Sequence, residues 1–285
     1  MNKLVLVTGA TSGFGNGLVK KLLERGCRVI ATGRNLSHRP DIFSEERSRF
    51  SHALQELDLD VTISAERIKA VEFAEKMGGI DVLINNAGYG LFGPLEDASD
   101  SKMRDQFEVN FFGPAQLIRD FLPQLRKQSG TIINLSSVLG FVGFPMASLY
   151  CASKFAIEGL SESLAYELAP HGVKVVLIQP GGYKTSFSGK TQWTFSGDNP
   201  SLHYSQQISG YRRMRDRQNQ SLFYQNPDDV TEGILNLLAN KNFKMRNTFG
   251  QDAQVSRFFR ALLPREWFHL IATKIYSYVF IHKNK

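Results

Sequence analysis

The feature that most constrains the fold of this chain is a glycine-rich turn between an apolar strand and a helix. Residues 3–8 form a short apolar run, the turn reads T-G-A-T-S-G-F-G over residues 8–15, and a helix is expected over 13–25. Glycines permit a tight turn and a close approach of the backbone to a ligand, and the helix N-terminus can hold a pyrophosphate. The spacing is GxxxGxG and not GxGxxG, but its place after a first strand favours dinucleotide binding over plain backbone geometry.

Strands and helices continue to alternate along the chain. Further strands are expected at 28–32, 53–59, 82–85, 131–135 and 173–179, and further helices at 65–77, 103–124, 150–168 and 228–238. This alternation predicts an α/β fold, a single doubly wound Rossmann-type domain with a mostly parallel sheet flanked by helices. The length of 285 residues suits one such domain, for which we expect the range 1–250.

A polar insert follows the last predicted strand. Residues 185–225 are rich in Ser, Gln and Arg and show no sheet-like period, so they are expected to be irregular. A long insert that leaves a strand end where ligands bind is typical of a lid over a site, and the alternative is a mobile surface loop. The next helix has Asn226 as its expected N-cap and Pro227 in its first turn.

The end of the second strand indicates the kind of dinucleotide. Enzymes that use NAD place an acidic side chain there to bind the ribose 2′-hydroxyl. Residues 32–35 read T-G-R-N and contain no carboxylate. Arg34 can instead pair with the 2′-phosphate of NADP(H), so NADP(H) is the predicted cofactor, although Arg34 can also be a solvated surface arginine.

The segment Y-C-A-S-K over residues 150–154 has the pattern of an acid/base site. Tyr150 and Lys154 are four apart and therefore project from one face of a helix. A neighbouring ammonium lowers a tyrosine pKa from its usual value near 10, which makes the phenol a better acid/base. A hydroxyl from Ser136 or Ser137 can hydrogen-bond a substrate carbonyl and stabilise an oxyanion.

Several motifs in order make the chain resemble a short-chain dehydrogenase/reductase. They are the glycine-rich turn, Asp60-Val61, N-N-A-G at 85–88, Asn110 in V-N-F-F-G, Ser137, Tyr150, Lys154, Pro180-Gly181 and Thr185. They cover residues 3–250. The resemblance implies an NADP(H)-dependent oxidoreductase that transfers a hydride between the nicotinamide and a carbonyl or alcohol group.

The resemblance also implies roles for four catalytic residues. Ser137 rather than Ser136 is the catalytic serine, because it precedes Tyr150 by thirteen positions, the family's usual spacing. Tyr150 protonates the carbonyl oxygen as hydride arrives, Lys154 binds the nicotinamide ribose and lowers the Tyr150 pKa, and Asn110 holds a water that links Lys154 to solvent.

A larger set of residues is implied to line the cofactor. Asp60 faces the adenine, the backbone of 86–88 lines the adenosine side, and the segment from Pro180 to Thr185 borders the nicotinamide. Asn85 and Asn86 can equally join neighbouring strands, and Asp60 can simply end a strand. The full set is Gly9, Thr11, Ser12, Gly13, Phe14, Gly15, Arg34, Asp60, Val61, Asn86, Ala87, Gly88, Tyr150, Lys154, Pro180, Gly181 and Thr185.

The substrate side is predicted to be apolar. Residues 139–149 include Phe141, Phe144 and Met146, and the N-N-A-G turn is followed by Leu91 and Phe92. This favours a lipophilic ketone or alcohol, and the sequence of residues 90–96 is similar to that of family members acting on steroids and retinoids. The alternative is a non-catalytic NADP-binding sensor or scaffold, which would not need all four catalytic residues. The six histidines show no metal-ligand spacing, so no metal is expected.

The net charge of +7 lies in the tail. Residues 241–285 hold nine Lys or Arg against two acids, whereas the first 240 residues hold 25 of each, which disfavours a nucleic-acid-binding protein. Residues 251–285 are expected to be a basic, aromatic-rich helical tail, divided by Pro264. Such a tail can lie on an anionic membrane surface, or it can pack on its own domain or on a partner subunit.

Location and assembly follow from general features. Two cysteines in a chain of this size indicate a reducing compartment, and neither a targeting segment nor a bilayer-spanning run is visible. We therefore expect a cytoplasmic protein, with peripheral membrane contact as a possibility of the tail. The resemblance implies a homo-oligomer through the helices that carry Asn110 and Tyr150.

Overall fold

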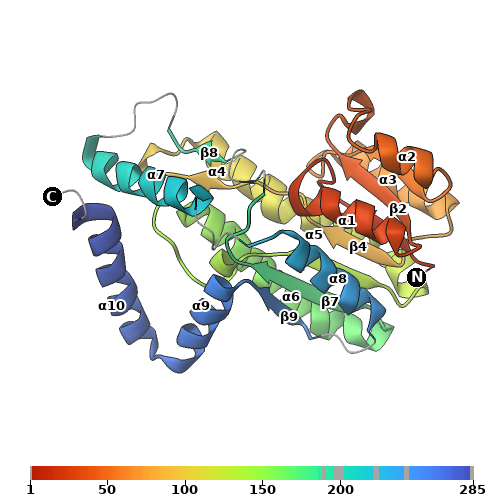
Figure 1. Ribbon diagram of the computed structural model, residues 1–285. Coiled ribbons are helices and arrows are strands. Elements are labelled where there is room, and N and C mark those ends of the chain that lie inside the picture. The colour runs from red at the N-terminus through yellow and green to blue at the C-terminus, as the bar shows by residue number, and fades with distance from the viewer. Residues whose placement is uncertain are drawn as a thin grey trace.

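The computed structural model describes residues 2–185, 187, 191–195, 202–220, 225–240 and 244–282 (Figure 1). Within these residues, one sheet of seven parallel strands has the order β3-β2-β1-β4-β6-β7-β9. The order reverses between β1 and β4, which creates the crevice where doubly wound sheets bind ligands. The strands are β1 Leu4–Val7, β2 Arg28–Gly33, β3 Leu54–Asp58, β4 Val82–Asn85, β6 Thr131–Leu135, β7 Lys174–Pro180 and β9 Arg246–Phe249. The predicted parallel α/β sheet is confirmed, and β9 is an edge strand that the sequence patterns did not predict.

The helices cover both faces of this sheet (Figure 1). On one face lie α1, α2 and α8, and on the other lie α3, α5 and α6. Their bounds are α1 Gly13–Glu24, α2 Ser44–Arg49, α3 Ser64–Lys76, α4 Asp100–Phe107, α5 Gly113–Lys127, α6 Ser148–Leu168, α7 Ser205–Gln220, α8 Asp228–Ala239, α9 Gln251–Leu262 and α10 Arg265–Tyr276. Helix α8 begins at Asp228 with Pro227 as its N-cap, one position later than the predicted N-cap Asn226, whose side chain accepts a hydrogen bond from the Asp228 N–H at 3.0 Å.

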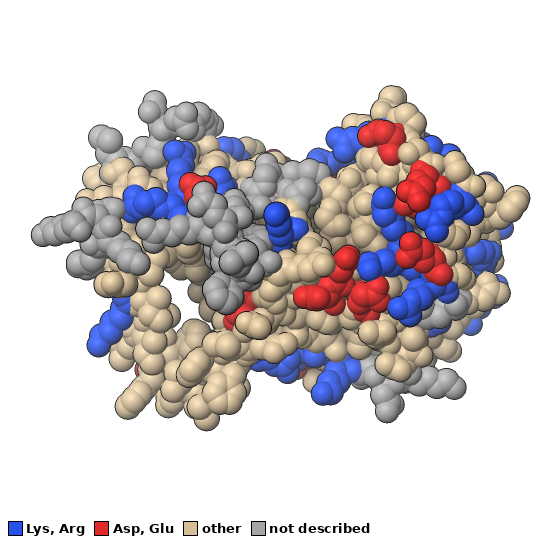
Figure 2. All heavy atoms as spheres, viewed as in Figure 1, with Lys and Arg blue, Asp and Glu red and all other residues tan. Residues whose placement is uncertain are grey.

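Ion pairs join α1 to α8 on the molecular surface. The Lys21 ammonium lies 2.7 Å from the Glu232 carboxylate, and the Arg25 guanidinium lies 3.1 Å from it. Figure 2 shows basic and acidic side chains interleaved over this part of the molecule. These contacts align the helix that follows the glycine-rich turn.

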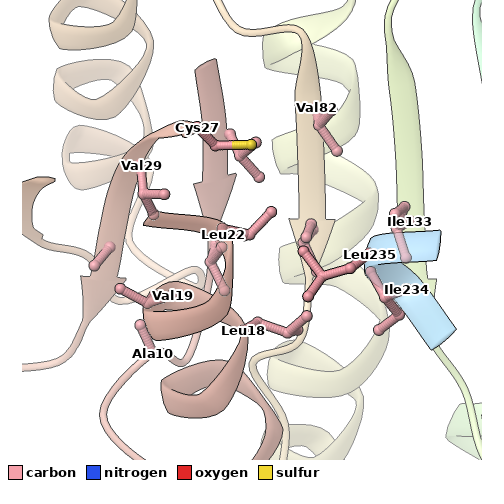
Figure 3. Packing of buried hydrophobic residues seen from close by; sticks show 14 of the residues in the cluster. Ala10, Leu18, Val19, Leu22, Cys27, Val29, Val82, Ile133, Ile234 and Leu235 are labelled. Atoms are coloured by element: carbon pink, nitrogen blue, oxygen red, sulfur yellow. The ribbon is translucent and has the colours of Figure 1, made fainter. Parts of the chain in front are cut away.

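Beneath α1 and α8, alternate residues of the strands form the larger core cluster (Figure 3). Val5 and Val7 point to this face, while Leu4 and Leu6 point to the α3–α5 face. Side chains alternate between the faces of a strand, so a strand buried on both sides is apolar throughout. The two cores therefore hold the carboxyl ends of β1, β2 and β4 in fixed positions.

The helix predicted over 103–124 is divided in the structure. Helix α4 ends at Phe107, a turn of π-helix spans Glu108–Phe112, and α5 begins at Gly113. The extra residue in a π-helical turn changes the direction of the side chains that follow it, and such turns are frequent at functional sites. Asn110 lies in this turn.

The prediction that residues 185–225 are irregular is wrong for α7, which occupies Ser205–Gln220. Ile208 and Tyr211 of α7 are buried in a third cluster, which also contains Phe92, Tyr150 and Phe280. The apolar residues of α7 are few and stand in a very polar sequence, which concealed their helical spacing. The positions 186, 188–190, 196–201 and 221–224 of the insert lie outside the described residues.

Two further helices end the described chain. Helices α9 and α10 form a hairpin that extends from the body, with Pro264 at its turn as predicted (Figure 1). After α10, a π-helical turn spans Ser277–His282 and packs on α7, where a Cβ atom at Gly210 would lie 2.9 Å from the Cα of Phe280. The tail thus returns to the body at its far end.

Candidate active site

The glycine-rich turn packs against the loop that follows β4. Gly9 is in the left-handed region with φ +66°, and a Cβ atom there would lie 2.8 Å from the Cα of Ala87. A Cβ atom at Gly15 would overlap the carbonyl oxygen of Gly9. Ser12 is the N-cap of α1, and Gly13 is its first residue. The turn therefore excludes side chains at Gly9 and Gly15 and brings the N-terminus of α1 to the sheet crevice.

Asn86 is a scaffold residue of this turn. Its side-chain amide donates to the carbonyl oxygens of Thr8 at 2.8 Å and Gly9 at 3.1 Å. The Thr8 hydroxyl in turn accepts from the backbone N–H groups of Asn86 and Ala87, both at 3.0 Å. The amide of Asn85 donates to Asn134 at 2.8 Å. Both asparagines therefore join neighbouring strands, as the sequence allowed, while contact of the 86–88 backbone with the cofactor stays a prediction.

The end of β2 presents an arginine to solvent. A Cβ atom at Gly33 would lie 2.6 Å from the methyl group of Thr11, so the glycine-rich turn lies directly against the end of β2. Arg34 follows and is exposed. The nearest strand partner with a carboxylate is Asp58, which accepts hydrogen bonds from the backbone N–H and the hydroxyl of Ser37. These bonds lower the Asp58 pKa below its usual value.

Arg34 also acts on the loop after β4. Burial raises the pKa of Tyr89 to about 12, the charge of Asp105 raises it further, and the charge of Arg34 opposes that rise. Arg34 is therefore near enough to the loop after β4 for its charge to act on Tyr89.

Asp60 and Val61 both have structural contacts. One carboxylate oxygen of Asp60 accepts from the N–H of Thr62 at 2.9 Å and from its hydroxyl at 2.7 Å. Val61 is buried, and a Cβ atom at Gly113 would lie 2.7 Å from its side chain. Phe14, another predicted cofactor residue, packs edge-on against Tyr183 at 5.6 Å.

Ser137, Tyr150 and Lys154 come together at the carboxyl ends of β6 and β7. All three side chains are buried, and Tyr150 and Lys154 lie one turn apart on α6 with the Lys154 ammonium 5.8 Å from the Tyr150 ring centre. Ser137 hydrogen-bonds the Tyr150 phenol. The Ser136 hydroxyl instead faces Gly140, where a Cβ atom would overlap it. The structure thus brings Ser137, and not Ser136, to the tyrosine.

Burial dominates the electrostatics of this group. It raises the pKa of Tyr150 above its usual 10, and the hydrogen bond with Ser137 opposes the rise. It lowers the pKa of Lys154 to about 8, against the charge of Glu158, and the ammonium donates to the Leu135 carbonyl at 2.7 Å. The predicted lowering of the Tyr150 pKa by Lys154 is not seen: burial is the largest influence on the phenol, and Lys154 is not among the groups that shift its pKa.

Asn110 ties the π-helical turn to the loop after β4. Its side-chain oxygen accepts from the Tyr89 N–H at 3.1 Å, and its amide donates to the Tyr89 carbonyl at 3.0 Å and to the Ser153 hydroxyl at 3.2 Å. A Cβ atom at Gly88 would lie 3.1 Å from the Asn110 oxygen and 3.8 Å from the Lys154 ammonium. Gly88 therefore brings Asn110 and Lys154 to one place, while the water-holding role of Asn110 stays a prediction.

The loop after β7 is held by a residue that the sequence patterns did not reveal. The Gly181 N–H donates to the Phe249 carbonyl of β9 at 2.9 Å, and the Asp252 carboxylate accepts from the Gly182 N–H at 2.7 Å. Thr185 follows, and its hydroxyl accepts from the Phe187 N–H at 3.3 Å. Asp252 lies in the first turn of α9, far along the chain, so no local pattern links it to Pro180 and Gly181.

Aromatic rings cover Tyr150. The rings of Phe92 and Phe187 each lie 5.8 Å from the Tyr150 ring, and Phe92 lies 5.3 Å from Tyr211 of α7. The Lys102 ammonium of α4 donates to three successive carbonyls of the insert, from Trp193 to Phe195, at 2.9 to 3.2 Å. Because Phe92 and Phe187 lie against its ring, the surroundings of Tyr150 are apolar. Among the described residues, no three His, Cys, Asp or Glu side chains are grouped to hold a metal ion.

Comparison with known proteins gives consistent matches. The family model for short chain dehydrogenases matches residues 3–194. The uncharacterized oxidoreductase YusZ of Bacillus subtilis is 34% identical over 96% of this chain and 99% of its own length. Human retinol dehydrogenase 8 is 34% identical over 86% of this chain and 80% of its own length.

Solved structures agree with the observed fold. A short-chain dehydrogenase from Streptomyces avermitilis superposes with a TM-score of 0.79 at 32% identity, covering 95% of this chain and 99% of the other. One from Burkholderia cenocepacia, in complex with NADP, has a TM-score of 0.73 at 28% identity and covers 95% and 97%. One from Burkholderia phymatum, in complex with NAD, has a TM-score of 0.74 at 24% identity and covers 86% and 88%.

Proposed function

The chain belongs to the short-chain dehydrogenase family of oxidoreductases, and from that premise we propose that it interconverts a carbonyl and an alcohol on a lipophilic substrate with NADP(H). The observation that carries this proposal is the buried group of Ser137, Tyr150 and Lys154 under an aromatic cover. The glycine-rich turn fits a dinucleotide, since it is packed too closely for side chains at Gly9 and Gly15 and leads directly into the N-terminus of α1.

The chain's own residues supply the proton chemistry. The raised pKa keeps the Tyr150 phenol protonated at neutral pH, which is the form that donates a proton to a carbonyl oxygen. Ser137 hydrogen-bonds the same phenol and is placed to bind the substrate oxygen as charge develops on it. Lys154, with a pKa of about 8, is mostly protonated at pH 7 and can return a proton to Tyr150 after the phenol has donated its own. The glycine-rich turn and Arg34 would hold NADP(H), which would supply or accept the hydride.

Arg34 supports NADP(H) as the cofactor in place of NAD(H). Arg34 is exposed, and Asp58, the carboxylate paired with the end of β2 on the neighbouring strand, is bonded to Ser37. A guanidinium–phosphate pair contributes about 1.5–3 kcal/mol, so Arg34→Ala should lower kcat/KM for NADPH by roughly 10- to 100-fold and leave NADH unaffected. Arg126→Ala, at an exposed arginine near the end of α5, is the control. Equal losses with both cofactors would contradict the assignment.

The aromatic surroundings of Tyr150 support a lipophilic substrate. Phe92 and Phe187 lie against Tyr150, and Tyr211 lies against Phe92. Phe187 and Tyr211 belong to the 185–225 insert, so the described part of the insert covers the catalytic phenol as the proposed lid. Human retinol dehydrogenase 8, whose name denotes a lipophilic alcohol, is among the relatives of this chain. A flat or extended lipophilic ketone or alcohol therefore suits this site better than a sugar.

The decisive experiment follows NADPH oxidation with a panel of ketones and aldehydes. Tyr150→Phe should lower kcat by about 10²- to 10⁴-fold while NADPH still binds, because the general acid is lost. Tyr166→Phe is the control, since Tyr166 lies on the same helix and is 70% exposed. If Tyr150→Phe keeps its activity, Tyr150 is not the acid. Saturable NADPH binding without turnover would instead favour a non-catalytic NADP-binding protein.

Assembly and location complete the proposal. Phe112, before α5, and Phe155, on α6, are each 43% exposed and offer an apolar face to a second copy of the chain. A homo-oligomer through this face predicts that Phe155→Asp lowers the mass measured by light scattering. Cys27 and Cys151 are free and buried, which suits the reducing cytoplasm.

A further inference from the structure

The α9–α10 hairpin presents two apolar stripes to solvent. In each helix the apolar residues recur with the spacing of one helical face, which in a globular protein normally faces the core. Here the side chains are between 45% and 65% exposed. The stripe of α9 is Val255, Phe258, Phe259 and Leu262, and that of α10 is Trp267, Leu270, Ile271 and Ile275. Contiguous exposed apolar surface on this scale marks an interaction site.

The hairpin is held at its base, its turn and its far end. At the base, Ala253 is buried and Arg257 donates to the Thr248 hydroxyl of β9 at 2.9 Å. Near the turn, the guanidinium of Arg260 lies 5.2 Å from the ring centre of Phe268, which joins α9 to α10. At the far end, Phe280 is buried against α7. The stripes are therefore displayed by an anchored element.

The charges of the tail indicate the occupant of this surface. Residues 251–276, which form the hairpin, hold four Lys or Arg and two acids, and one of these acids, Asp252, is bonded back to Gly182. A second copy seated on the same face would bring two cationic tails together, whereas an anionic lipid surface would attract them. Trp267 and Tyr278 are 65% and 61% exposed, and amphipathic rings of this kind favour the headgroup region of a bilayer. In Figure 2 the hairpin is a mostly uncharged projection.

We propose that the α9–α10 hairpin docks this protein on the surface of an anionic lipid bilayer. The apolar stripes lie among the acyl chains near the headgroups, and the basic side chains contact the lipid phosphates. None of the helices in the described ranges is long and apolar enough to cross a membrane.

The docked hairpin would stand beside the cover of the active site. Phe280, after α10, lies 6.1 Å from Phe144, which lies 6.5 Å from Tyr211 of α7. Tyr211 in turn contacts Phe92, which stacks on Tyr150. A lipophilic substrate leaving the bilayer would therefore meet α7 first. This consequence rests on the proposed function, whereas the docking itself does not.

The test measures sedimentation of the full chain with vesicles, without any assay of activity. Vesicles of phosphatidylcholine are compared with vesicles in which one third of the lipid is phosphatidylglycerol. The variant Phe258→Ser/Leu262→Ser/Leu270→Ser/Ile275→Ser removes four exposed apolar side chains and should keep its NADPH affinity and thermal unfolding. It should bind anionic vesicles roughly 100-fold more weakly than the wild type, since each side chain contributes to burial in the lipid.

The control removes exposed apolar side chains elsewhere. Ile68, Leu95 and Tyr166 are 52%, 54% and 70% exposed, and their serine variants should bind vesicles as the wild type does. Lys274→Glu should weaken binding at least threefold and reduce its dependence on salt, whereas Lys69→Glu on α3 should not.

Three results would overturn the proposal. The first is that the wild type sediments with neither kind of vesicle, and the second is that it binds neutral and anionic vesicles equally. The third is that the wild type is a dimer that does not bind vesicles, whereas the quadruple serine variant is a monomer. In that case a second copy of the chain, and not a lipid surface, would occupy the face. An inactive protein that still binds anionic vesicles would contradict the proposed function and leave the docking proposal standing.

Discussion

Replacing the buried Lys154 should change the stability of the protein in opposite directions at neutral and at high pH. The side chain is 7% exposed, and burial lowers its pKa from 10.5 to about 8. In the unfolded chain the same group titrates near 10.4. Holding the protonated form in the native state instead of in water therefore costs about 3 kcal/mol, since a tenfold change in a protonation equilibrium corresponds to about 1.4 kcal/mol.

The cost disappears as the pH rises. Below pH 8 Lys154 is protonated in both states, so the native state carries the whole cost. Between pH 8 and 10.5 the native state loses the proton and the unfolded chain keeps it, so the free energy of unfolding increases with pH. From pH 7 to pH 10 this group alone should add about 2–3 kcal/mol to the stability of the wild type.

The variant Lys154→Met isolates this effect. It removes the charge but leaves the Leu135 carbonyl without its donor, which costs about 1–3 kcal/mol. At pH 7 we expect Lys154→Met to be as stable as the wild type or more stable by about 2 kcal/mol, and at pH 10 to be the less stable protein.

Urea unfolding of both proteins at pH 7 and pH 10 measures the difference directly. Other titrating groups are common to both proteins and cancel. Lys69→Met, at an exposed lysine of α3, should show a difference that does not change with pH. If the difference in the free energy of unfolding between the wild type and Lys154→Met is also the same at pH 7 and pH 10, the pKa of Lys154 is not lowered and burial does not dominate at this site.

Further predictions concern backbone space, core packing and thiol chemistry. Gly15→Ala should lose NADPH binding in a fluorescence titration and about 1–3 kcal/mol of stability, because its Cβ atom would overlap a backbone carbonyl of the same turn. Gly159→Ala, where nothing lies within 4 Å, should stabilise α6 by about 0.5–1 kcal/mol, and a loss of stability would contradict the open space. Phe121→Ala should destabilise by about 3–5 kcal/mol in urea, since that ring is fully buried; a smaller cost would mean that the core can collapse around it. Burial raises the pKa of both Cys27 and Cys151, so the thiols should react with an aromatic disulfide reagent only after unfolding, and rapid labelling of the native chain would show them to be accessible.

The elements with strong local patterns were predictable from the sequence. The strands β1, β2, β4, β6 and β7 are short apolar runs bounded by turns, and the structure contains each of them. The edge strand Arg246–Phe249 has no such run, because it packs against only one neighbour and all four of its residues are half-buried. Helix α7 was likewise concealed, since only a few of its side chains meet the core.

The candidate site divides in the same way. The spacing of Tyr150 and Lys154 is enough to place both side chains on one helical face, because the α-helix repeats every 3.6 residues. Only the structure shows that Ser137, and not Ser136, contacts Tyr150, because this depends on which hydroxyl meets a helix that begins eleven residues after Ser137.

By itself, the sequence determined the doubly wound sheet, the glycine-rich turn at its crevice and the shared helical face of Tyr150 and Lys154, because these depend on periodicity and on neighbours along the chain. Only the tertiary structure decided the scaffold role of Asn86, the raised pKa of Tyr150 and the exposure of the stripes on α9 and α10. Each of these depends on desolvation and on contacts between residues far apart in the chain, and neither is encoded in a local pattern.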